Sequence, residues 1–194
     1  LRVTDPPRSP PSVTVSDSQR WAAVGRLLHD DTIRRKTRIA GLLTLLFAQP
    51  ISRIVALRSS QISISDDHAV HVVFAAIPIQ MPPLLDDLIR EHLEQQCESR
   101  YTPSHTGWLF PGRLPGTHLS TENIRTQLVA VGVKPYEHRK AALFQLASDM
   151  PAPVLAELLA ITTKNAAAWA KLAARDWTDY VTERGRSMPH RRRS

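Results

Sequence analysis

The sequence is short of cysteine and of long apolar stretches. Its 194 residues include a single cysteine, Cys97, which excludes an internal disulfide and is typical of a reducing cytoplasm. The longest apolar run, around residues 42–48, is far too short to span a bilayer, and the start of the chain shows no signal-peptide pattern. We therefore expect a cytoplasmic protein that makes no use of a membrane.

Candidate metal ligands are also sparse. His68 and His71 have the spacing of a ligand pair, but they lie in a strand pattern with no cysteine or carboxylate set at metal spacing. We expect neither a metal site nor a cofactor.

The net charge of +7 is unevenly distributed along the chain. Residues 184–194 hold five arginines and no acid, so the other 183 residues carry 20 basic and 18 acidic side chains, or +2. Within them, residues 32–58 have six basic side chains and no acid, whereas residues 66–98 have seven acids and one arginine. This polarity suits a protein that presents one side to a polyanion. Two solvated helices of opposite charge would give the same pattern.

Proline content and periodicity divide the chain into three parts. Residues 1–15 contain four prolines and little to bury, which is typical of a flexible arm or linker. Residues 16–183 are expected to form one domain, and residues 184–194 a basic, disordered tail. Because the first residue is Leu, we expect a piece of a longer protein.

The domain has helical patterns on both sides of a short stretch of strands. Ser16 and Gln19 form a capping-box pattern at the first helix, and a central core helix is expected to begin at residues 30–32 and to end before Pro50. Alternating apolar residues at 62–64 and 70–74 predict a β-hairpin. Further elements are expected at residues 77–80 (a strand), 84–97, 120–132, 135–149, 154–161 and 162–175 (helices). The fold class is mainly α with a small antiparallel β insertion (α+β).

Two stretches near the end of the domain have a basic character. Arg139 lies one turn before Leu143 on an apolar stripe, at the expected start of a helix. There it would either bind a phosphate or close the helix end by pairing with Glu137 or a carbonyl. Downstream, two short helices joined by a tight turn resemble a helix-turn-helix whose second helix presents Lys164 and Lys171. A solvated basic face would produce the same pattern.

The order of these segments resembles the catalytic domain of tyrosine recombinases of the phage-integrase type. Residues 37–62 resemble the first signature of the family, residues 62–96 its small sheet and following helix, residues 108–120 its Leu-Phe-Pro segment, and residues 135–161 its second signature. The resemblance covers residues 37–180, about three quarters of the chain. It implies a helical bundle that binds double-stranded DNA, and a homo-oligomer that exchanges C-terminal segments.

In that family a tyrosine attacks a DNA phosphodiester, assisted by two arginines, a lysine and two histidine-type positions. Arg139 matches the second arginine, whereas the lysine has no counterpart in residues 74–80. Other residue types occupy the remaining positions: Pro50 for the first arginine, Tyr136 and Ile161 for the histidines, and Trp169 or Ala170 for the nucleophile. Arg53 is one turn past Pro50 and is placed to approach the same site, and Tyr180 lies ten residues too late.

We therefore expect a non-catalytic, nucleoid-associated DNA-binding protein on a degenerate recombinase fold. The expected phosphate contacts are Arg34, Arg35, Lys36, Arg53, Arg139, Lys140, Lys164 and Lys171. Two alternatives stay open. One is an active recombinase that uses Arg139 and a displaced Tyr180. The other is a protein-interaction module or homo-oligomeric scaffold, in which the acidic helix at 84–98 or the closing helix docks a partner.

Overall fold

The computed structural model describes the backbone of residues 13–98 and 107–187, and the side chains of residues 13–96 and 107–175. Most of the expected N-terminal arm and C-terminal tail lies outside these residues. No helix among the described residues is both long enough and apolar enough to cross a membrane.

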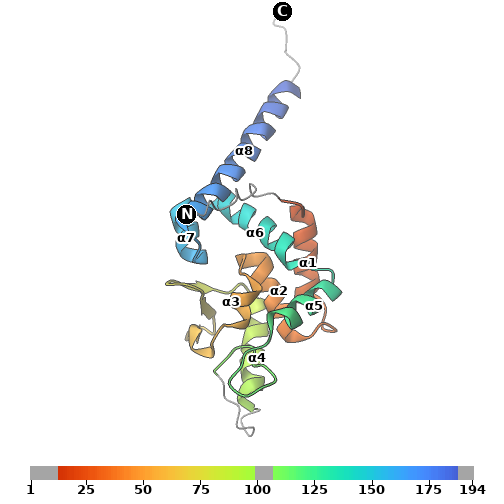
Figure 1. Ribbon diagram of the computed structural model, residues 1–194, viewed down its shortest axis with the longest axis vertical. Coiled ribbons are helices and arrows are strands. Elements are labelled where there is room, and N and C mark those ends of the chain that lie inside the picture. Colours follow the sequence, from red (N-terminus) through yellow and green to blue (C-terminus); the bar gives the residue numbers. More distant parts are fainter. Residues whose placement is uncertain (1–12, 99–106, 188–194) are drawn as a thin grey trace, which may run out of the picture.

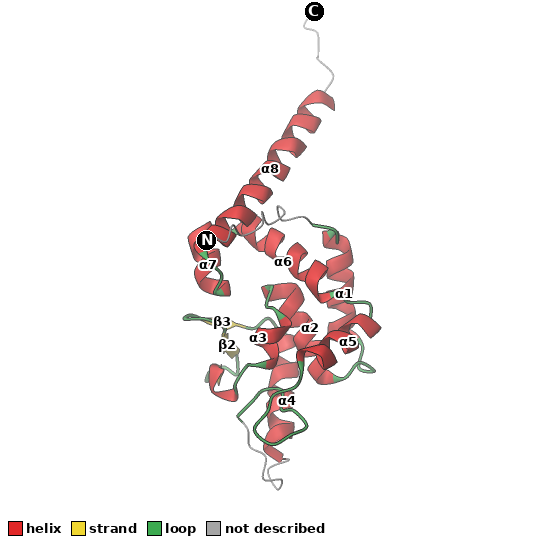
Figure 2. Ribbon diagram, in the orientation of Figure 1, coloured by secondary structure: helices red, strands yellow, loops and turns green. Residues whose placement is uncertain are grey.

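Helices dominate the architecture (Figure 2). Along the chain, a small sheet follows the third helix and precedes the fourth. In chain order the elements are α1 Asp17–His29, α2 Arg35–Phe47, α3 Ile51–Val55, a 3-10 turn Ser59–Gln61, β1 Ile62–Ile64, β2 Val70–Val73, β3 Pro78–Gln80, α4 Leu85–Glu98, α5 Thr121–Ala130, α6 Pro135–Asp149, α7 Ala152–Leu159 and α8 Thr163–Ser187. The predicted fold class, mainly α with a small antiparallel insertion, is confirmed.

The sheet is a meander in the order β1-β2-β3, with both pairs antiparallel. Val72 in the central strand lies opposite Ile62 on one side and Ile79 on the other. Val70 and Val72 are buried, while His71 between them is half-buried. This period-two alternation places one face of the sheet on the core.

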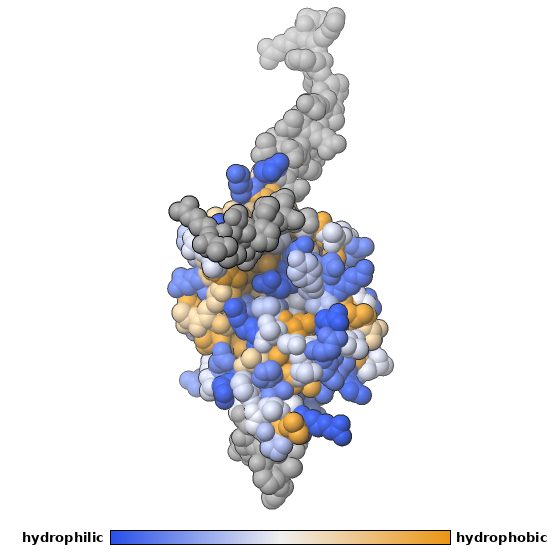
Figure 3. All heavy atoms as spheres, in the orientation of Figure 1, coloured by the Kyte–Doolittle hydropathy of each residue, from blue (hydrophilic) through white to orange (hydrophobic). Residues whose placement is uncertain are grey.

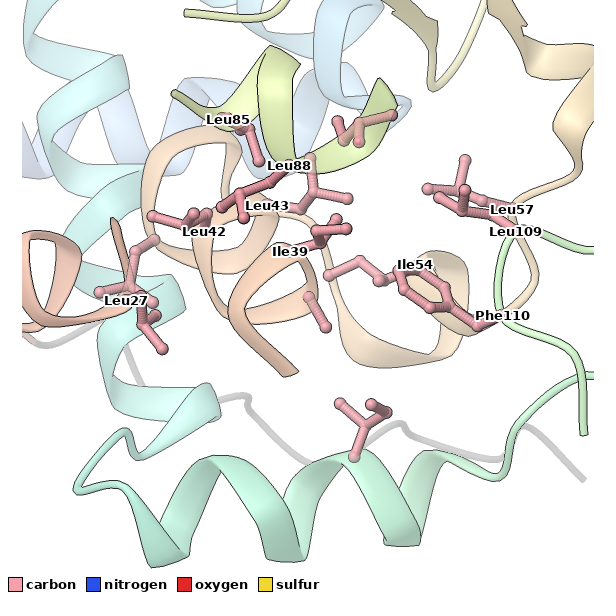
Figure 4. Packing of buried hydrophobic residues seen from close by; sticks show 14 of the residues in the cluster. Leu27, Ile39, Leu42, Leu43, Ile54, Leu57, Leu85, Leu88, Leu109 and Phe110 are labelled. Carbon is pink, nitrogen blue, oxygen red and sulfur yellow. The ribbon is translucent and has the colours of Figure 1, made fainter. Parts of the chain in front are cut away.

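The main hydrophobic core surrounds α2, which packs against α1, α4, α5 and α6. Leu27, Ile39, Leu42, Ile54 and Phe110 fill this core, and they come from four different segments of the chain (Figure 4). Because α2 has neighbours on all sides, it is apolar around nearly its whole circumference instead of along one stripe.

A second, smaller core joins α6, α7 and α8. Leu143, Leu155 and Trp169 are buried there, and Ala48 from the end of α2 completes the cluster. The beginning of α8 packs in this core, and the rest of the helix leads away from the body (Figure 1). The fold therefore has a compact body and one helix that extends beyond it.

The start of α2 differs from the prediction, because the helix begins at Arg35 and not at residues 30–32. The carboxylate of Asp30 instead accepts hydrogen bonds from the backbone N–H and the hydroxyl of Thr32. This local turn competes with the helix, as is usual for short polar side chains at such positions. Arg34 precedes the helix and provides no side-chain cap.

Candidate nucleic-acid interface

The break between α2 and α3 forms the base of the candidate site. Ala48 adopts the left-handed conformation (φ 50°), and Pro50 directly precedes α3. Proline has no backbone N–H and fixes its own φ, so α2 cannot continue through it. The chain therefore turns sharply, and the carbonyl of Ala48 is left without a helical partner.

Arg139, in the second turn of α6, supplies that partner. Its Nε donates a hydrogen bond to the carbonyl oxygen of Ala48 at 2.7 Å. Its two terminal nitrogens have no hydrogen-bond or ion-pair partner within the described part of the chain. Burial lowers the pKa of Arg139, and the nearby charge of Arg53 lowers it further, while Tyr136 has the opposite effect. Arg139 is thus a partly desolvated cation that an anion would stabilise.

A depression of about 520 Å³ opens beside Arg139. Its floor includes the buried side chains of Thr44 and Gln49, and its rim includes Tyr136, whose exposed fraction is 66%. The whole lining consists of Thr44, Gln49, Pro50, Ile51, Arg125, Val129, Lys134, Pro135, Tyr136, Glu137 and Arg139. Three of these side chains are cationic and one is acidic. Arg125 is paired with Glu122 at 2.7 Å, so Lys134 and Arg139 are the cations of the depression that have no ion-pair partner among the described residues.

Arg53 does approach Arg139, as its spacing from Pro50 suggested, but its terminal nitrogens are hydrogen-bonded to oxygen atoms of the protein. Its Nη1 donates to the side-chain oxygen of Gln49 at 3.1 Å and to the carbonyl of Leu159. Its Nη2 donates to the carbonyl of Ala160 at 3.3 Å. Arg53 therefore satisfies carbonyls at the end of α7, and the depression has one guanidinium available for an anion where two were expected.

The basic cluster at the start of α2 lies apart from Arg139. Ala48, which contacts Arg139, follows Arg35 by 13 residues, or roughly 19 Å along a helix. Arg34 is exposed and Lys36 is half-buried. Arg35 forms an ion pair with Glu91 of α4 at 2.8 Å, and Arg90 of α4 pairs with its own acidic neighbours. The basic and acidic blocks of the sequence thus lie side by side and partly neutralise each other.

The remaining predicted contacts are divided between α6 and α8. The ammonium group of Lys140 lies 4.5 Å from the centre of the Tyr136 ring, in a cation–π contact. Lys164 and Lys171 are exposed on α8, on the side away from the buried Ala166, Trp169 and Ala173. The backbone of Tyr180 belongs to α8, but its side chain lies outside the described residues.

Sequence reasoning missed several members of the depression. Gln49 is fully buried, with both ends of its amide hydrogen-bonded, and Thr44 is buried with its hydroxyl donating to the carbonyl of Ala40. A polar residue directly before a helix-breaking proline was the available signal for Gln49. For Lys134 the sequence offered no signal beyond its charge, because its position at the depression depends on the packing of α6 against α2.

The geometry can be compared with that of known proteins. No protein-family model and no curated protein sequence matches this chain. Solved structures do match it. The crystal structure of XerA recombinase aligns with a TM-score of 0.62 and 14% identity, over 100% of this chain and 70% of XerA. The fold of this chain is similar to that of XerA recombinase.

Two structures of the XerH site-specific recombinase are similar as well. The pre-cleavage complex with its difH substrate gives a TM-score of 0.63 at 10% identity, over 86% of this chain and 53% of XerH. The post-cleavage complex with a palindromic difH substrate gives 0.65 at 8% identity, over 90% and 53%. The chain thus spans about half the length of XerH. At these identities the similarity establishes the fold alone, and it agrees with the fold that the sequence resemblance implied.

Proposed function

We propose that this chain binds the phosphate backbone of double-stranded DNA on the face that contains the depression beside Arg139. The observation that carries the proposal is the state of Arg139, which is half-buried, bonded to a carbonyl through one nitrogen and without a carboxylate partner among the described residues. Phosphate contacts from Arg and Lys provide sequence-independent affinity. The proposed set also includes Arg34, Arg35, Lys36, Lys140, Lys164 and Lys171. Arg53, which the sequence placed in the same set, donates to oxygens of the protein and is left out of it.

The residues at the catalytic positions support binding without cleavage. Pro50, Ile161 and Trp169 stand where the resemblance places an arginine, a histidine and the tyrosine nucleophile. Trp169 is 5% exposed and serves the second core. Loss of one group that stabilises a transition state costs about 10²–10³ in rate, so the loss of several is expected to abolish the reaction. Cleavage through Tyr180 is the alternative, and it predicts a covalent adduct that Tyr180→Phe removes.

The similar structures support DNA as the class of partner, because two of them are complexes of XerH with its difH substrate. A DNA-binding protein with this role would be cytoplasmic and nucleoid-associated, and phosphate binding by arginine and lysine needs no cofactor. We further propose that residues 16–183 act as one DNA-binding unit between the proline-rich residues 1–15 and the arginine-rich residues 184–194.

The extended end of α8 favours a second role in self-association. This helix continues past its packing against α6 and α7 and leads away from the body (Figure 1). An isolated helix in water is only marginally stable, so a second copy of the chain is its simplest support. We propose a homo-oligomer on this basis. Sedimentation velocity over a wide range of protein concentration tests it, and a single monomeric species throughout would contradict it.

Fluorescence anisotropy with a short generic duplex tests the DNA-binding proposal. The titration is repeated over a range of salt concentrations, with the whole chain and with a variant that ends before residue 184. We expect the shortened chain to bind with a steep salt dependence, and Arg139→Gln to weaken binding and reduce the salt slope by about one. Arg113→Gln, at an exposed arginine of the loop before α5, is the matched control.

No binding by the shortened chain at low salt would overturn the proposal and leave the protein-interaction alternative. The same samples, run on a denaturing gel, show whether the protein only binds DNA or also cleaves it. A covalent adduct between protein and DNA would contradict the non-catalytic part of the proposal.

A further inference from the structure

Tyr136 has an unusual position for an aromatic residue. It lies in the first turn of α6, is 66% exposed and lines the depression together with Arg139. Lys140, one turn later on the same helix, lies over its ring at 4.5 Å. Core packing does not account for a tyrosine held in this way, and an exposed aromatic ring among cations is a frequent feature of surfaces that bind nucleic acids.

The depression has two kinds of wall. Lys134 and Arg139 provide positive charge, whereas Pro50, Ile51 and Val129 are apolar, and 51% of Val129 is exposed. A phosphate group requires only the cationic wall. A ligand that uses the apolar wall and the tyrosine ring as well must combine a flat apolar group with an anion. A nucleotide has this combination.

We propose that the depression takes one unpaired nucleotide of a DNA strand, with its phosphate on Arg139 and its base against Tyr136. This inference rests on the proposed function, since it assumes that the same face meets DNA. A base that is paired and stacked inside a duplex cannot reach a pocket. The chain should therefore prefer DNA with an unpaired nucleotide to a perfect duplex.

The floor of the depression indicates that this recognition tolerates any base. The amide nitrogen of Gln49 donates to the carbonyl of Phe47, and its oxygen accepts from Arg53. The hydroxyl of Thr44 donates to the carbonyl of Ala40 at 2.9 Å. Each of these groups already has a partner in the protein, so we expect binding to depend mainly on stacking and charge and to discriminate little between bases.

The test compares a perfect duplex, the same duplex with one unpaired nucleotide, and the corresponding single strand, by anisotropy with the whole chain. Stacking of one base predicts a preference for the unpaired nucleotide of roughly fivefold or more. Tyr136→Leu should abolish this preference, while Tyr136→Phe should keep it. Changing the unpaired base should alter affinity by much less than removing it.

The outcomes separate this inference from the proposed function. Binding to the perfect duplex without any preference, or a preference that survives Tyr136→Leu, would overturn the nucleotide pocket alone. Failure to bind any DNA would overturn both. Calorimetry with adenosine monophosphate tests whether the ligand of the depression is a free nucleotide and not part of a DNA strand. Saturable binding that Tyr136→Leu removes, without a preference among the DNAs, would overturn the assignment to a DNA strand.

Discussion

The Nε of Arg139 lies 2.7 Å from the carbonyl oxygen of Ala48 and joins the beginning of α6 to the end of α2. This bond fixes the direction of the guanidinium, because the group is planar and a bond at Nε holds the orientation of the whole plane. The two terminal nitrogens are consequently held at the depression and do not sample the solvent freely. An arginine held in this way loses less conformational entropy when it binds a phosphate than a freely moving arginine would.

The same kind of contact recurs elsewhere in the fold. Arg20 donates to the carbonyl of Leu45 near the end of α2, Arg38 to those of Leu27 and Leu28 at the end of α1, and Arg53 to those of Leu159 and Ala160 at the end of α7. The last carbonyls of a helix have no partner within it, and they lie at the negative end of its dipole. Arginines therefore serve here as caps on other helices, which explains part of the basic composition without reference to DNA.

The first prediction follows from the contacts of Arg53. Arg53→Met should lower the free energy of unfolding by about 1–3 kcal/mol, because several carbonyl and amide oxygens lose a charged donor. Affinity for duplex DNA should change much less than in Arg139→Gln. Urea unfolding followed by circular dichroism, with anisotropy on the same samples, measures both quantities. A large loss of affinity without loss of stability would show that Arg53 contacts DNA directly.

These arginines also mark the limit of what the sequence could predict. The capping box of Ser16 and Gln19 forms as expected, because its two partners are three residues apart. The predicted position of Arg139 at the edge of the core relied on its helical spacing from Leu143, and its carbonyl partner was one of two open alternatives. The carbonyl partners of Arg53, on Leu159 and Ala160, are more than a hundred positions away, so no local pattern could identify them.

The charge pattern shows the same limit. Arg38 is one of the six basic side chains counted in residues 32–58, yet it is 7% exposed and pairs with Asp31. Sequence position gives the charge of a side chain, but its burial depends on which helices pack around it. The order of elements was predictable because hydrophobic periodicity is local, whereas the distribution of free cations depends on tertiary packing.

The second prediction concerns Glu137, the one acid among the described residues that line the depression. Glu137→Gln should increase affinity for duplex DNA about two- to fivefold, because a like charge near the phosphate is removed. It should cost a few tenths of a kcal/mol in stability, since an acid in the first turn favours the helix. Glu94→Gln on α4 is the control and should leave affinity unchanged. Equal gains in the two variants would indicate an effect of net charge alone.

The third prediction uses His92, whose ring nitrogen bonds to the carbonyl of Leu109. Burial lowers the pKa of His92, and the nearby charges of Arg35 and Lys36 lower it further, although the bond to Leu109 acts in the opposite direction. The folded state therefore favours the neutral ring. The corresponding stability is present above the ordinary pKa of about 6.5 and is lost as pH falls below it.

The free energy of unfolding should thus decrease as pH is lowered from about 7.5 to about 5.5, and His92→Gln should reduce the decrease. Glutamine keeps a donor for the carbonyl of Leu109 and does not titrate. Urea unfolding at several pH values measures the effect. A decrease of the same size in both proteins would assign it to other groups.

The fourth prediction concerns the turn between α7 and α8. Ala160 is exposed and adopts the left-handed conformation (φ 48°), which glycine reaches without the steric cost of a Cβ atom. Ala160→Gly should therefore raise the free energy of unfolding by about 0.5–1 kcal/mol. Ala168→Gly, at an exposed position inside α8, should instead lower it by about 1 kcal/mol. Thermal unfolding of the two variants measures the opposite signs, and a loss of stability in both would show that the turn is not strained.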